Sequence, residues 1–274
     1  MKCLLRNKEN LAAKGVAVPG PGRYRKLLRD TFNAMKTGSA DGGAPDVLLD
    51  AILDVAKADR VLLSNANFFG APRAAMRHGI LYPMAPRRMK NLCDLFPDAE
   101  IELFMALRNP ASFLPHAFQQ SPRADTAHFM DGVDPRMVRW SDSLLRIRQA
   151  VPQVPITVWC NEDAPLIWSR IVRDMADLSS GDVIIGAYDL LSDIITPDSF
   201  DRFSAYMAGR PDLTEPQIQR IVAAFMEKFA QDGVVEEELD MPGWTDDLVA
   251  DMSRTYDEDI DRIAQMPGVR LITP

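Results

Sequence analysis

Arg108 is the residue whose type and position most clearly predict chemistry. The apolar run 101–107 (IELFMAL) has the length of a buried strand, and Pro110 favours a helix immediately after it. In open parallel sheets ligands collect at the carboxyl ends of the strands. A guanidinium binds phosphate through a planar two-point fork. The spacing therefore predicts an anion site at Arg108, with an ion pair at the sheet edge as the structural alternative.

Ser64 and Asn65 follow another strand-like run, residues 60–64. Because the carboxyl ends of parallel strands open on the same edge of a sheet, we expect these two side chains to lie near Arg108 and to orient a ligand. The alternative interpretation is turn chemistry, since Asn at a strand exit commonly bonds its own backbone.

The Arg108-Asn109 pair and the helix after it resemble the phosphate-binding strand and helix of the sulfotransferases that use 3′-phosphoadenosine 5′-phosphosulfate (PAPS). In that family a Ser eight residues after the Arg helps to hold the 3′-phosphate, and His116 stands at that position here. The resemblance implies PAPS or its product adenosine 3′,5′-bisphosphate (PAP) as the cofactor, bound by Arg108, His116, Ser64 and Asn65. An imidazole donates most strongly to phosphate when protonated; the alternative for His116 is a partly buried helix residue with a satisfied hydrogen bond.

The same family carries a phosphate loop after its first strand. Neither G-x-x-x-x-G-K-[ST] nor Pro-Lys-x-Gly-Thr occurs in residues 1–274, and the resemblance aligns residues 4–18 with the helix and second strand that follow the loop. Loss of a single oxyanion donor costs about 10²–10³ in rate. We therefore expect the first strand and loop to be missing, PAPS binding to be weak or lost, and the chain to be a truncated or inactive sulfotransferase-like protein. No catalytic residue is assigned.

Other chemical groups have structural interpretations that outweigh the functional ones. Ala66 stands near the position where the resembling enzymes have a general base, and His78 is the nearest other base in sequence, in an arginine-rich loop typical of a surface. Glu162 and Asp163 follow the strand-like run 155–160, where nucleotide-hydrolysing enzymes place metal ligands. Asp163 also fits a helix N-cap, and sulfuryl transfer needs no metal, so we predict no metal site.

The fold predicted by these patterns is α/β, a parallel sheet flanked by helices, with the P-loop-type sulfotransferase fold implied by the resemblance. We expect residues 16–18, 60–64, 101–107 and 156–160 to be neighbours in one parallel sheet, and 269–272 to return as a strand that covers an exposed edge. The expected domains are an α/β core over 1–178 and a mainly helical C-terminal extension over 179–274.

Several helices have clear sequence signals. Residues 2–14 have a helical pattern that ends at Gly15, and an amphipathic helix is predicted to begin at Asp134-Pro135. Thr214 and Gln217 form a predicted capping box, and Thr245 opens a last long helix. A loop is predicted over 37–43 and a solvated acidic face over 236–238.

Composition narrows the class of partner. The net charge of −8 argues against nucleic-acid binding, although the basic first 110 residues suit a small anionic nucleotide. Three separated cysteines indicate a reducing compartment, and no apolar run is long enough for a membrane span, so we predict a cytoplasmic protein. The alternative function is a non-enzymatic binding or interaction protein on the same scaffold. A nucleotide-sugar glycosyltransferase is a weaker third hypothesis. Oligomeric state is not predicted.

Overall fold

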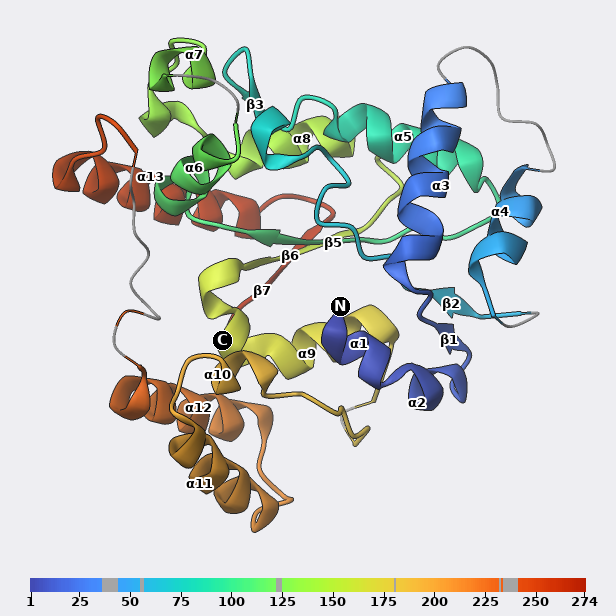
Figure 1. The fold of residues 1–274 in the computed structure, drawn as a ribbon, viewed down its shortest axis with the longest axis vertical. Coiled ribbons are helices and arrows are strands. Elements are labelled where there is room, and N and C mark those ends of the chain that lie inside the picture. The colour runs from blue at the N-terminus through green and yellow to red at the C-terminus, as the bar shows by residue number, and fades with distance from the viewer. Residues whose placement is uncertain (36–43, 55–56, 122–124, 180, 232, 234–240) are drawn as a thin grey trace.

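The chain is an α/β protein in which helices surround short parallel strands (Figure 1). The computed structural model describes residues 1–274 except 36–43, 55–56, 122–124, 180, 232 and 234–240. The predicted loop over 37–43 and the predicted acidic face over 236–238 lie outside the described residues. No helix in the described part is both long and apolar enough to cross a membrane.

The three-stranded sheet is parallel, with the order β5 (Leu103–Leu107), β6 (Ile156–Cys160), β7 (Val269–Ile272). In its register Leu107 lies opposite Cys160, and Trp159 lies opposite Ile272. The central strand β6 is almost wholly buried, as its uninterrupted apolar run predicts. The predicted strands at 101–107, 156–160 and 269–272 are confirmed.

A second parallel ladder joins β1 (Val16–Ala17) to β2 (Arg60–Val61), and an antiparallel hairpin joins β3 (Met76–Arg77) to β4 (Ile80–Leu81). The pairings within each ladder are parallel as expected, but the expectation of one continuous sheet is wrong for the described residues.

The reason for the split lies just beyond β2. Ser64 donates its backbone N–H to the Tyr24 hydroxyl and accepts from it through its carbonyl, both at 2.7 Å, so α3 takes the backbone groups that could have extended the sheet. An ion pair between Arg60 and Glu102 joins the beginnings of β2 and β5 instead. Strand β7 pairs with β6 on the side away from β5, so it does not cover the edge of β5.

The N-terminal helices pack beside the short ladder and are α1 (Lys2–Arg6), α2 (Lys8–Ala12), α3 (Pro21–Ala34), α4 (Ala44–Ile52) and α5 (Ala85–Leu95). The single helix predicted over 2–14 is interrupted at Asn7, whose buried side chain both donates to Ile185 O and accepts from Ile185 N at 2.8 Å. This long-range contact explains the break.

The middle of the chain contains η1 (Pro72–Ala74), α6 (Pro110–Gln119), α7 (Thr126–Met130), η2 (Pro135–Met137), α8 (Trp140–Ala150), η3 (Asn161–Asp163) and α9 (Ala164–Ala176). The helix predicted to begin at Pro135 is only a 3₁₀ turn there. Val138 and Arg139 are extended, and the α-helix starts again at Trp140. The restart is fixed by buried Asp259, which accepts hydrogen bonds from Trp140 N at 2.7 Å and Ser141 N at 3.1 Å.

The C-terminal helices are α10 (Asp189–Ser192), α11 (Pro197–Ala208), α12 (Glu215–Phe229) and α13 (Asp246–Ala264). The capping box is confirmed, because Thr214 N donates to Gln217 Oε1 at 2.8 Å. Helices α11 and α12 surround the buried Phe203, whereas α13 packs into the largest core cluster beside β6. The domain boundary at residue 178 stays a prediction.

Candidate anion-binding site at the ends of β5 and β6

The register of the sheet brings two sequence-distant charged residues to one edge. Because Leu107 and Cys160 lie opposite each other, the residues that follow them leave the sheet side by side. The Asn109 N–H donates to Glu162 Oε1 at 2.8 Å, which ties the two strand exits together. Arg108 and Glu162 therefore share the carboxyl edge of β5 and β6.

Arg108 is held against the first turn of α6. Its Nε donates to Ser112 Oγ at 3.0 Å, and its carbonyl accepts from Trp140 Nε1 at 2.8 Å. The Asn109 side chain caps α6 by accepting from Ala111 N at 2.9 Å. The turn is thus fixed on both sides, and the guanidinium leans on the beginning of the helix, as the strand-Arg-helix pattern predicts.

His116 lies on the same side of α6 as Ser112, one turn further along. It is exposed, and its Nε2 is 2.7 Å from Gln120 Nε2. The exposed position does not match the partly buried histidine of the structural alternative. Arg108, Ser112 and His116 thus present a guanidinium, a hydroxyl and an imidazole along one side of the helix.

Ser64 and Asn65 belong to the end of the other ladder. The Ser64 carbonyl accepts from Arg25 Nε at 3.1 Å and Nη2 at 2.9 Å in addition to the Tyr24 hydroxyl. Asn65 Oδ1 accepts from Asn67 N at 3.0 Å, the turn chemistry that was the alternative for this residue. The hydrogen bonds described for Ser64 and Asn65 therefore go to α3 and to the turn itself rather than to Arg108.

Helix α13 supplies a third side of the site. Ser253 Oγ accepts from Asn109 Nδ2 at 2.9 Å, and the buried Tyr256 hydroxyl lies 3.3 Å from both Leu107 O and Glu162 Oε2. Sequence reasoning missed both residues. The helical period places Tyr256 on the apolar face of α13, but nothing in the sequence indicates which strand exit that face meets.

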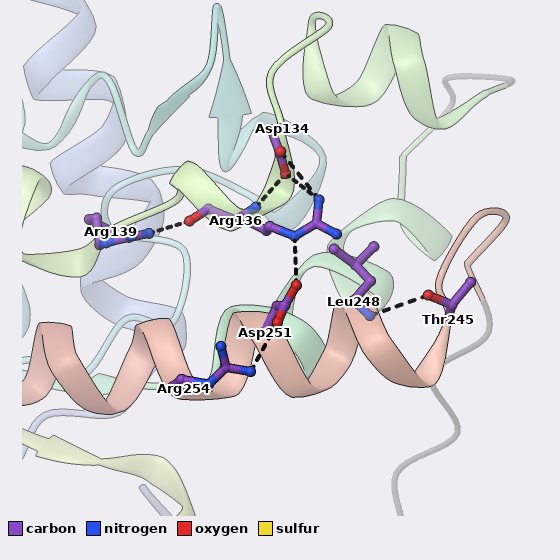
Figure 2. Close-up of polar contacts among 7 residues, drawn as sticks. All are labelled: Asp134, Arg136, Arg139, Thr245, Leu248, Asp251 and Arg254. Carbon is purple, nitrogen blue, oxygen red and sulfur yellow. Dashed lines mark hydrogen bonds and ion pairs between the residues drawn. The ribbon is translucent and has the colours of Figure 1, made fainter.

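An ion-pair network fixes the position of α13 (Figure 2). Arg136 lies between Asp134 and Asp251, with its Nε 3.1 Å from Asp251 Oδ2, and Arg254 donates to Asp251 Oδ1 at 2.9 Å. The hydrogen bond from Arg136 is the main cause that holds the pKa of the Asp251 carboxyl below its usual range. The network links α13 to the 3₁₀ turn before α8, on the side where Trp140 supports Arg108.

Burial and neighbouring charge shift the titration of two further groups at this edge. Burial, and then the charge of Glu162, raise the pKa of Asp163. Asp163 stands at the N-cap position of α9 but makes no side-chain capping bond, so the cap predicted for it is wrong. Burial is also the main cause that raises the pKa of the Cys160 thiol. Within the described residues no group of three or more His, Cys, Asp or Glu side chains is arranged to hold a metal ion.

A cavity of about 470 Å³ lies at the opposite, amino end of β5, β6 and β7. Its walls include Arg60, Arg173 and Arg270. Arg60 pairs with Glu102, and Arg173 and Arg270 pair with Glu215 and Asp174, both at 2.7 Å. Because carboxylates already balance these cations, we assign no ligand to this cavity.

Replacing Tyr256 by Phe is expected to reduce the loss of stability in alkali. Burial is the main cause that raises the pKa of Tyr256 above its ordinary value. Above pH of about 10 the unfolded state loses this phenolic proton while the folded state keeps it. Stability supplied by the neutral phenol is therefore complete below pH of about 10 and falls as the pH rises further. Urea unfolding at pH 8 and pH 10.5 measures this, and an equal loss in both proteins would contradict it.

No family model, curated protein or solved structure matches this chain.

Proposed function

We propose that this chain is a sulfotransferase-like protein that binds a small anionic nucleotide of the PAPS and PAP class at Arg108. The observation that carries the proposal is the alignment of Arg108, Ser112 and His116 on one side of α6, at the exit of a parallel strand. These groups are donors to phosphate oxygens, and Arg108 offers the two-point geometry that phosphate favours.

The architecture at this edge also supports a nucleotide half-site. Strands β5 and β6 are parallel, and each is followed by a helix. Ligands of such sheets bind outside the carboxyl ends of the strands. The P-loop-type sulfotransferase fold is part of the proposal, and so is sulfuryl transfer to a hydroxyl as the ancestral reaction. Since residues 1–274 contain no phosphate-loop motif, we propose nucleotide binding rather than turnover for this chain.

Calorimetric titration with PAP tests the proposal. We expect weak binding by the wild type, and we expect Arg108→Ala to weaken it at least tenfold, because a charge-assisted contact to phosphate is lost. Ser112→Ala should weaken it less. Arg202→Ala is the matched control, since it removes an exposed arginine of α11 far along the chain.

The outcomes separate the competing functions. Equal binding by wild type and Arg108→Ala would remove Arg108 from the ligand site. No binding by either protein would favour the non-enzymatic interaction protein on the same scaffold. Thermal unfolding of both proteins checks that the substitution leaves the fold intact. A cytoplasmic location remains part of the proposal, based on the free thiols of Cys3, Cys93 and Cys160.

A further inference from the structure

Glu162 places a negative charge at the edge where Arg108 would bind an anion. Its Oε1 accepts the Asn109 N–H at 2.8 Å, and its Oε2 lies 3.3 Å from the Tyr256 hydroxyl. A carboxylate offers about four lone-pair positions, so these two bonds leave acceptor capacity unused. The residue is exposed, so a ligand at this edge can reach that capacity.

A carboxylate beside a phosphate-binding arginine discriminates between anions. A bare anion that approaches Arg108 meets repulsion from Glu162, and such like-charge placement suppresses the wrong ligand. A ligand that carries a hydroxyl next to its phosphate replaces this repulsion with a hydrogen bond to the carboxylate. Hydrogen bonds to charged groups are the stronger ones.

We infer that Glu162 selects nucleotides with a free ribose hydroxyl beside the phosphate, by accepting a hydrogen bond from the 2′-hydroxyl while Arg108 binds the 3′-phosphate. The inference rests on the nucleotide binding proposed above. Arg108 and Glu162 leave neighbouring strands, which are spaced by about 4.8 Å. The 2′-hydroxyl and the 3′-phosphate stand on adjacent ribose carbons, and this separation suits two groups presented one strand apart.

Calorimetry with two ligands and two proteins tests the inference. The ligands are PAP and 2′-deoxyadenosine 3′,5′-bisphosphate, and the proteins are the wild type and Glu162→Gln. Glutamine keeps an oxygen that accepts the Asn109 N–H, so the turn retains its support. We expect the wild type to bind PAP about tenfold to a hundredfold more tightly than the deoxy ligand. In Glu162→Gln this ratio should fall severalfold, because the acceptor is no longer charged.

Inorganic sulfate gives a second readout that a structural role would not move. We expect Glu162→Gln to bind sulfate more tightly than the wild type, since the repelling charge is removed. Glu258→Gln is the matched control, because it removes an exposed carboxylate of α13 and should leave both the nucleotide ratio and sulfate binding unchanged.

Each failure has a different meaning. If the wild type binds both nucleotides equally, Glu162 does not read the hydroxyl and the inference is overturned, while nucleotide binding at Arg108 stands. If sulfate binds no better to Glu162→Gln than to the wild type, the repulsion that we infer is absent. If neither nucleotide binds the wild type, the proposed function fails and the inference fails with it.

Discussion

Replacing Asp259 by alanine is expected to destabilise the native protein by about 2–4 kcal/mol, because it leaves two buried donors unsatisfied. Asp259 is 3% exposed, and its Oδ2 accepts from Trp140 N at 2.7 Å and Ser141 N at 3.1 Å. These N–H groups begin α8 and have no partner within the helix. Urea unfolding at neutral pH should show a lower midpoint at an unchanged slope.

Two further variants make the Asp259 result specific. Asp259→Asn keeps an acceptor oxygen for the helix and should cost clearly less than Asp259→Ala. Asp257→Ala removes an exposed carboxylate two residues away and should change stability by no more than about 0.5 kcal/mol. If Asp259→Ala unfolds at the wild-type midpoint, the carboxylate is not what fixes the start of α8.

Removing β7 by ending the chain after Gly268 is expected to have a larger effect. Strand β6 would lose its parallel partner, and the core would lose Ile272, which is 1% exposed. Burial of such a side chain contributes about 1.5–3 kcal/mol, and each ladder hydrogen bond adds about 0.5–1.5 kcal/mol. The sum approaches the total stability of about 5–15 kcal/mol typical of a protein of this kind. We therefore expect no cooperative thermal transition by near-ultraviolet circular dichroism.

A shorter deletion is the control for the loss of β7. Removing only Thr273 and Pro274 takes away one exposed contact, between Arg170 Nη1 and Thr273 O at 3.2 Å. This deletion should cost no more than about 0.5 kcal/mol. If the protein without β7 melts cooperatively at the wild-type temperature, β7 is not part of the folded unit.

The elements predicted correctly are those whose signal is local. The apolar runs of β5 and β6 and the box formed by Thr214 and Gln217 need only their own neighbours to be recognised. The breaks at Asn7 and Val138 were not predicted, because their causes are distant in sequence. Asn7 binds the backbone of residue 185, and the extended residues after Met137 precede a helix capped by residue 259. Long-range partners of this kind are invisible to periodicity.

The candidate site divides in the same way. Arg108 could be placed because a strand, an arginine and a helix follow each other in the sequence, and the structure shows it at that strand exit. Ser253 and Tyr256 reach the exit from α13 and could not be found by spacing. Ser64 was expected to offer its side chain, whereas the structure uses its backbone to bind Tyr24 and Arg25. The same bonds end the short ladder, so one local contact accounts for two expectations that differ from the structure.

The order of strands in the three-stranded sheet has a consequence for the rate of folding. Strand β6 pairs with β5 across α6, α7 and α8, but it pairs with β7 only after α9 to α13 have been brought back, with Ile156 opposite Val269. The entropy of closing a loop rises with its length and must be overcome before a distant contact contributes. The β5–β6 pair should therefore form early in refolding, and the β6–β7 pair should set the slow step.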